Sequence, residues 1–128
     1  MKTSKQFIYI LFVLFGISFG QVEAACDLPE NSISILNDGS IIYNSEYDIF
    51  GFQFGVQGAS ILSASGGDAE AVGFTVSTNS SVVLGFSLVG TVVESGCGVL
   101  VGLNLDQVPE GLFNIVISDT TNTMHHQR

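Results

Sequence analysis

Short segments rich in Val, Ile and Phe alternate with turn residues about every 8–12 positions, and this spacing limits the fold more than any other feature of the chain. Branched and aromatic residues favour strands, whereas the Gly, Asn, Asp and Ser between them favour tight turns. No segment has the apolar period of an amphipathic helix. The pattern predicts an all-β fold, a single sandwich of about eight to nine strands over residues 25–119. The expected strands are 32–36, 41–44, 48–57, 60–64, 72–77, 82–89, 99–105 and 113–118.

Three details of this pattern are specific. Asn37-Asp38-Gly39 is a strong hairpin-turn signal between the first two strands. Gly51 and Gly55 indicate a bulge or a close backbone approach within the strand over 48–57. Ala69-Glu70-Ala71 is expected to add one short helical turn.

The N-terminus has the composition of a secretory signal peptide. Lys2 and Lys5 precede an apolar run of 14 residues, Phe7 to Gly20, which is shorter than the roughly 20 residues that span a bilayer. Residues 22–24 supply a cleavage site. We therefore expect residues 1–24 to be removed and the protein to be secreted, into the extracellular space or, in a bacterium, the periplasm, with no membrane contact after cleavage.

The two cysteines, Cys26 and Cys97, form an even set in a chain predicted to be exported, which predicts a disulfide. The bridge would close about 70 residues, for which the chain-entropy model gives roughly 4–5 kcal/mol. Two free thiols are the alternative, and the spacing matches no zinc motif. An uncleaved anchor and a lipoprotein at Cys26 also stay open, although Glu23 stands where lipoprotein signals have an aliphatic residue.

The chain is strongly acidic, with 12 Asp and Glu against 3 Lys and Arg and a formal net charge of −9. Lys2 and Lys5 belong to the leader, so Arg128 is the one cation beyond it. Nucleic acids and anionic membranes are bound through cationic side chains, and we exclude both as partners. The only histidines, His125-His126, lie in the segment 120–128, which is predicted to be a disordered tail. We therefore expect no enzyme activity.

Five short segments of the sequence resemble those of a known family. They are Ile49-Phe50-Gly51-Phe52-Gln53-Phe54, Ala64-Ser65-Gly66-Gly67, Gly73-Phe74-Thr75-Val76-Ser77, Val83-Leu84-Gly85-Phe86-Ser87 and Gly96-Cys97-Gly98-Val99-Leu100. Together they resemble cohesin-like β-sandwich modules of secreted proteins, over roughly residues 31–118. The resemblance implies a jelly-roll-like sandwich of about nine strands. True cohesins bind dockerin modules through one sheet face, so it also implies a protein partner, but it assigns no contact residue.

Candidate binding residues gather near the first predicted hairpin. Tyr43 and Tyr47 supply aromatic surface, and Glu46 and Asp48 share a face if this stretch is extended. The tyrosines and Phe50 form either a contact patch or part of the core. Paired carboxylates also serve glycoside hydrolases, but such pairs need an enclosed cleft that a domain of this size has little chain to build.

Loop positions supply two further candidate sites. Asp38, Asp68 and Glu70 lie in oxygen-rich loops and are candidate calcium ligands, since this cation takes six to eight oxygens. They lack EF-hand spacing, and solvated turn acids are the alternative. Asn79-Ser80-Ser81 is a sequon, so Asn79 is expected to be glycosylated if the source is eukaryotic.

These features predict a secreted, non-catalytic binding or scaffolding module for extracellular protein–protein interaction. One alternative is a carbohydrate-binding module for polysaccharide, weakened by the absence of Trp. Another is a self-assembling structural subunit, because scarce lysine leaves strand edges unprotected. Saccharide binding predicts coplanar exposed aromatics, and self-assembly predicts a long uncovered edge strand. For protein binding we expect a flat face that mixes apolar and acidic residues.

Overall fold

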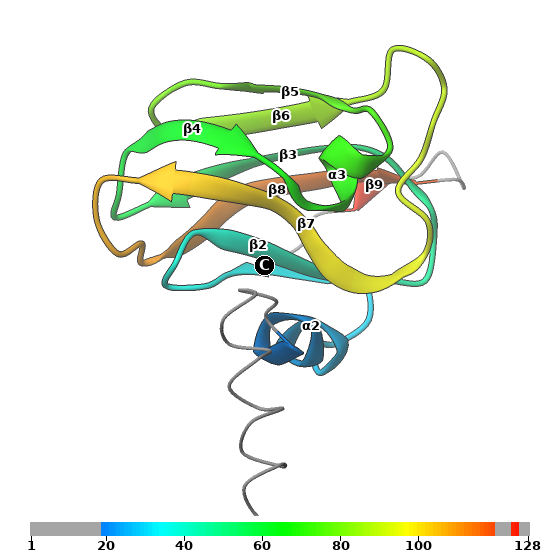
Figure 1. Cartoon of the computed structure of the whole chain (residues 1–128), viewed down its shortest axis with the longest axis horizontal. Helices are drawn as coiled ribbons and strands as arrows, with labels where there is room; N and C mark the ends of the chain where they lie inside the picture. The colour runs from blue at the N-terminus through cyan, green and yellow to red at the C-terminus, as the bar shows by residue number, and fades with distance from the viewer. Residues whose placement is uncertain (1–18, 120–123, 126–128) are drawn as a thin grey trace, which may run out of the picture.

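The chain folds into two antiparallel sheets stacked face to face (Figure 1), which confirms the predicted all-β sandwich. The computed structural model describes residues 19–119 and 124–125. One sheet has the strand order β1-β2-β7-β4 and the other β5-β6-β3-β8-β9. The strands are β1 (Ser32–Ile35), β2 (Ser40–Ser45), β3 (Ile49–Gln57), β4 (Ile61–Ser65), β5 (Thr75–Thr78), β6 (Val82–Phe86), β7 (Gly96–Leu105), β8 (Gly111–Asp119) and β9 (Met124–His125).

The first predicted turn forms as expected. Gly39 has a φ of +93°, which L side chains rarely adopt, and a Cβ there would run into the carbonyl oxygen of Leu103. The Oδ1 of Asp38 accepts the Ser40 backbone N–H at 2.9 Å, and the Leu36 N–H donates to the Ser40 carbonyl at 2.9 Å. A glycine and an acid in these places therefore connect β1 to β2.

Phenylalanines fill the space between the sheets. Phe52 stacks on Phe54, with 6.0 Å between ring centroids, and on Phe74, with 6.1 Å. The Phe52 ring lies over Gly85 of the neighbouring strand β6, where a Cβ would collide with it. Gly85 therefore makes room for the ring of Phe52 in the core. The core also contains Ile33, Ile41, Tyr43, Ile49, Val56, Ile61, Ala69, Val83, Val93, Leu100, Val101, Leu103, Ile115 and Ile117.

Two short helices cover part of the sandwich. Helix α2 (Phe19–Cys26) packs against β2 and β7, where Ala25 and Ile42 are buried outside the core cluster, so it covers the outer face of the four-stranded sheet. Helix α3 (Gly67–Ala71) crosses between the sheets and closes one end of the core with Ala69. It is the short helical turn that the sequence predicts. No helix among the described residues has the length and apolar character to cross a membrane.

Several predicted boundaries differ from the structure, including the start of β7, which is Gly96 rather than residue 99. The strand expected over 72–77 begins at Thr75, because Val72 and Gly73 end α3 with hydrogen bonds to its carbonyls. The strand expected over 82–89 ends at Phe86, because the Ser87 hydroxyl accepts the N–H groups of the following turn. In the predicted tail, Met124–His125 pair with the open edge of β8, a departure from disorder at these two positions.

The predicted signal-peptide boundary and the predicted disulfide can both be compared with the structure. The expected cleavage point after Ala24 lies inside α2, and the leader before residue 19 lies outside the described residues. Cys26 and Cys97 form the predicted disulfide, with 5.1 Å between their Cα atoms. The bridge joins the last residue of α2 to the second residue of β7.

Candidate functional site

The five-stranded sheet presents an outer face without charge. Residues directly opposite each other in antiparallel strands point to the same side of a sheet. The register therefore defines three outward rows across β5, β6, β3 and β8, called here the outer face. The rows are Thr75, Phe86, Gly51 and Ser118; Ser77, Leu84, Gln53 and Val116; and Val82, Gly55 and Phe113. None of these side chains carries a charge.

Glycines shape the outer face. A Cβ on Gly55 would collide with the ring of Phe113, which covers the glycine from the next strand. Within the described chain, no aromatic ring covers Gly51. A gap therefore lies between its two neighbours in the row, Phe86 and Ser118. The register between β3 and β8 shifts just before each glycine, with the extra residue in β3 before Gly51 and in β8 opposite the step to Gly55, so the bulge expected in β3 is present before Gly51.

The gap at Gly51 is part of a groove of about 170 Å³. Since each water in the liquid takes about 30 Å³, this space fits one branched aliphatic side chain. Leu84 on the groove wall keeps 40% of its surface exposed. The outward-facing groove residues, called here the outer-face groove, are Gly51, Gln53, Leu84, Phe86, Val116 and Ser118.

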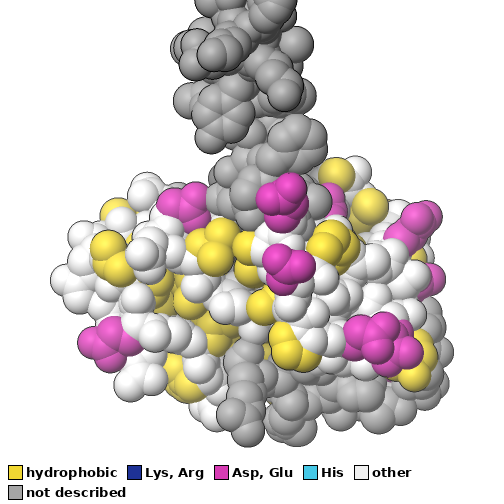
Figure 2. Space-filling model, turned by 90° about the horizontal axis from the view of Figure 1, so that it is seen from below, with side chains coloured by type: hydrophobic (Ala, Val, Ile, Leu, Met, Phe, Trp, Pro, Cys, Tyr) yellow, Lys and Arg dark blue, Asp and Glu magenta, His cyan; other side chains and the backbone are white. Residues whose placement is uncertain are grey.

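Charge lies elsewhere on the molecule. Figure 2 shows acidic side chains spread over the surface seen from below, where the described residues present no Lys, Arg or His. The three cations of the chain, Lys2, Lys5 and Arg128, all lie outside the described residues. The expected mixture of apolar and acidic residues on one face is therefore wrong for the outer face, which is apolar and polar but uncharged.

The predicted binding residues near the first hairpin do not form one patch. Tyr43 points into the core and is buried, because α2 and the second sheet cover β2 from both sides. Glu46 accepts a 2.8 Å hydrogen bond from the Asn31 amide, and Asp48 accepts the Ser95 backbone N–H at 2.8 Å. Tyr47 lies between them in the β2–β3 turn. The two acids therefore fix connections between segments.

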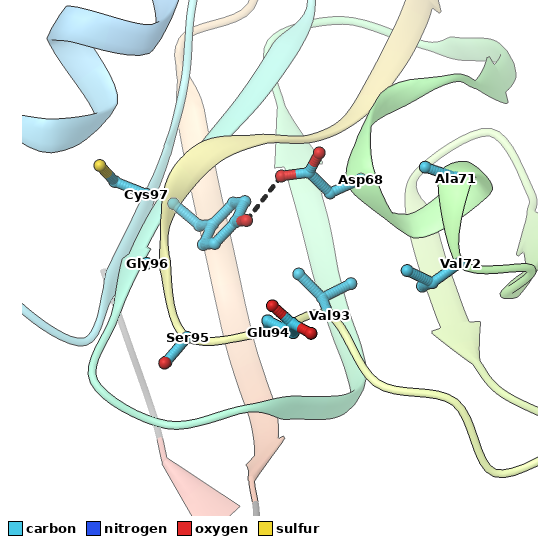
Figure 3. A pocket seen from close by; sticks show the side chains of 9 residues that line it. Asp68, Ala71, Val72, Val93, Glu94, Ser95, Gly96 and Cys97 are labelled. Carbon is cyan, nitrogen blue, oxygen red and sulfur yellow. Dashed lines mark hydrogen bonds between the residues drawn. The ribbon is translucent and has the colours of Figure 1, made fainter.

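Tyr43 instead belongs to a pocket of about 300 Å³ beside the disulfide. Its hydroxyl donates to Asp68 Oδ2 at 2.6 Å (Figure 3). Asp68 comes from α3 and Glu94 from the segment before β7, so the two carboxylates enter from different sides. Among the described residues, the pocket lining contains no His, Lys or Arg, which leaves it without a general base that titrates near neutral pH.

The environment of Tyr43 keeps its hydroxyl protonated. Burial raises the pKa of Tyr43, and the hydrogen bond and negative charge of Asp68 raise it further. A Cβ on Gly98 would lie 2.9 Å from Asp68 Oδ2, so glycine at this position leaves room for the carboxylate. A protonated Tyr43 hydroxyl that donates to Asp68 suits a structural link between β2 and α3.

We expect Tyr43→Phe to lower the free energy of unfolding by about 1–3 kcal/mol near pH 7, since a partly buried carboxylate loses its donor. Because the folded-state pKa of Tyr43 is raised, its contribution is complete below about pH 10 and falls as the pH rises beyond that value. Urea unfolding of both proteins at pH 7 and pH 11 checks this. The difference between them should shrink at pH 11, with Tyr47→Phe as control; an unchanged difference contradicts the link.

The candidate calcium ligands lie apart from one another. Asp38 caps the first turn, Asp68 accepts from Tyr43, and Glu70 Oε1 accepts the Gly66 backbone N–H at 2.7 Å. Within the described ranges, no group of three or more His, Cys, Asp or Glu side chains is placed to hold a metal. These carboxylates fix turns and the end of α3, so the structure gives a calcium ion no shared site among them.

The sequon residue Asn79 lies exposed in the turn between β5 and β6. Its Oδ1 accepts the backbone N–H groups of Ser81 at 2.9 Å and Val82 at 2.8 Å. Asn79 therefore has a role in the turn whether or not it is modified. Its glycosylation stays a prediction.

No family model, curated protein or solved structure matches the chain. The class that the fold defines is an antiparallel β-sandwich with one disulfide. The resemblance to cohesin-like modules stays a prediction. Sequence reasoning missed the outer face, although one signal was available: the chain has no charged residue from 71 to 93 and none from 111 to 118.

Proposed function

We propose that the chain is a secreted, non-catalytic module that binds a protein partner through the outer face. The uncharged rows of β5, β6, β3 and β8 carry this proposal. An antiparallel sheet with one face on the core usually has polar side chains on its other face. Here that face holds Leu84, Phe86 and Val116 around a groove, and apolar surface of this kind marks interaction sites.

Contrast with the second sheet supports the choice of face. The outer face of the four-stranded sheet receives α2, which buries Ile42. Among the described residues no helix packs on the outer face of β5, β6, β3 and β8, where Leu84 keeps 40% and Phe113 keeps 38% of its surface exposed. A partner would remove this surface from water, which is favourable at roughly 25 cal/mol per Å² of apolar area.

The geometry gives less support to the two alternatives. Phe50 and Phe113, the exposed aromatics of the described chain, lie toward opposite ends of β3, which does not make a coplanar platform for sugar rings. Three of the sheet edges are short, since β1 and β5 have 4 residues each and β4 has 5, and short edges resist continuous strand pairing. At the fourth edge, the described pairing of β9 covers only Ile117 and Ser118 of the 9-residue β8, so assembly through the edge of β8 stays an alternative.

Matched double substitutions test the proposed face. Leu84→Gln with Val116→Gln makes the groove polar, and Leu62→Gln with Val108→Gln makes the same chemical change away from it. Exported protein would be immobilised, secreted proteins of the source retained on it identified, and the affinity of each purified ligand measured. We expect the groove variant to weaken binding about tenfold or more, as at an interface hot spot, and the control to change it less than about threefold.

Two results contradict the proposal. One is equal binding by the groove variant and the wild-type protein. The other is retention of polysaccharide alone, which would favour the carbohydrate-binding alternative. Melting temperatures of both variants should stay close to that of the wild-type protein, because Leu62, Leu84 and Val108 are exposed and Val116 is half-buried on the outer face rather than in the core.

A further inference from the structure

The connection between β6 and β7 carries the two most exposed large apolar side chains of the described chain. Leu88 keeps 74% of its surface exposed and Val89 keeps 76%. Figure 1 shows this connection projecting from the sandwich beyond the ends of the strands. Residues 87–92, called here the apolar loop, contain no charged side chain. The loop therefore presents an apolar tip to solvent.

Hydrogen bonds hold the apolar loop in one shape. The Ser87 Oγ accepts the N–H groups of Val89 at 3.2 Å and Thr91 at 2.9 Å. The Thr91 hydroxyl donates to the Val72 carbonyl at 2.7 Å, so its 2.9 Å contact with Ser87 takes its proton from Ser87. This frame anchors the loop to the end of α3. A preformed tip loses little conformational entropy when it binds.

The apolar loop and the outer-face groove are complementary. The groove has about 170 Å³ of space above Gly51, enough for one branched aliphatic side chain, and its residues are uncharged. The loop ends in a Leu and a Val. Their exposure rules out that they fill the groove of their own molecule.

Charge also favours contact between these two regions. Copies with 12 acidic and 3 basic residues repel one another over most of their surfaces. The loop and the outer face are where two copies can meet without opposing carboxylates. At physiological ionic strength, charges farther away than about 8 Å are largely screened.

We propose that the apolar loop of one copy docks on the outer face of a second copy and inserts one of its two branched side chains, Leu88, into the outer-face groove. The inference rests on the proposed function, because it names a partner for the same sheet face. Loop and groove are different surfaces, so the contact is head to tail and leaves a free loop and a free groove at the ends. One loop in one groove is a small interface, and we expect a Kd between about 1 µM and about 1 mM.

Sedimentation velocity of the purified exported protein over this concentration range tests the inference. We expect the wild-type sedimentation coefficient to rise with concentration. Leu88→Gln with Val89→Gln removes the loop contact, and Leu84→Gln with Val116→Gln removes the groove contact, so each variant alone should stay monomeric. The control, Leu62→Gln with Val108→Gln, should associate like the wild-type protein.

Mixing the loop variant with the groove variant is the most decisive experiment. One then supplies an intact groove and the other an intact loop, so the mixture should form a complex of two copies and nothing larger. A monomeric mixture overturns the head-to-tail contact, as does a wild-type protein that stays monomeric at about 1 mM or a loop variant that associates normally. Single substitutions Leu88→Gln and Leu84→Gln replace any double variant that fails to fold.

Failure here is distinguishable from failure of the proposed function. Suppose that the wild-type protein stays monomeric but the groove variant binds a different protein partner less tightly than the wild-type protein does. The outer face then binds proteins but does not bind a second copy. If the groove variant changes neither self-association nor partner binding, both proposals are wrong.

Discussion

Replacing Cys26 and Cys97 together by serine is expected to lower the free energy of unfolding by about 4 kcal/mol. The bridge joins residues 71 positions apart, so its removal frees most of the described chain to explore extended states when it unfolds. The loss is large beside the roughly 5–15 kcal/mol by which domains are usually stable. It also releases α2 from the first turn of β7.

Urea unfolding of the oxidised wild-type protein and the double serine variant measures this effect. The wild-type protein unfolded with a reductant is the control, and its curve should coincide with that of the variant. Cys97 is partly exposed beside the pocket (Figure 3), so reductant can reach the bridge. A difference below about 1 kcal/mol would mean that the bridge is incidental to stability.

Phe54→Ala is expected to lower the free energy of unfolding by about 3–5 kcal/mol. The side chain is fully buried between the two sheets, and its ring stacks on Phe52. Its removal loses the free energy of burying the ring and leaves a cavity that neighbouring rings fill only in part. Calorimetry or urea unfolding measures the loss.

Phe50→Ala is the matched control on the same strand. Phe50 keeps 43% of its surface exposed, so its removal should cost no more than about 1 kcal/mol. Similar losses for the two substitutions would contradict the assignment of Phe54 to the inner face and Phe50 to the outer side of β3.

The strands, the first turn and the disulfide could be predicted because each depends on local residue types. Alternation of apolar and polar residues places Phe52, Phe54 and Val56 on one face, and it holds in the structure. It fails in β2, where Ile41, Ile42 and Tyr43 are all buried in succession. Helix α2 covers the second face of β2, and no residue pattern within β2 predicts this contact. For Tyr43 the sequence left a contact patch and the core open, and the structure places it in the core.

The outer face could not be predicted from single strands. Leu84, Gln53 and Val116 become neighbours only through the register of β6, β3 and β8. Register shifts within β3 change which residues lie opposite each other, and two glycines remove the side chains that would fill the row. Pairings between strands far apart in sequence decide the site, whereas the residue pattern decides only that strands form.

The candidate acids illustrate the same limit. Asp38, Asp68 and Glu70 were grouped by chemistry, but in the folded chain each accepts a different hydrogen bond: Asp38 and Glu70 from nearby backbone N–H groups, and Asp68 from Tyr43 on another strand. Carboxylates near glycine-rich loops serve turns more often than metals, since backbone N–H groups there need acceptors. The spacing of acidic residues along the sequence does not distinguish a hydrogen-bond acceptor in a turn from a metal ligand.

Site-specific photo-cross-linking tests most directly the claim that the outer face binds a protein. A benzophenone amino acid would replace Leu84 on the outer face in one protein and Leu62 on β4 in another, both at exposed positions. Irradiation in native secreted material should yield a protein adduct from position 84 and little from position 62. Equal adducts from both positions, or an adduct from position 62 alone, would contradict an interaction module that works through the outer face.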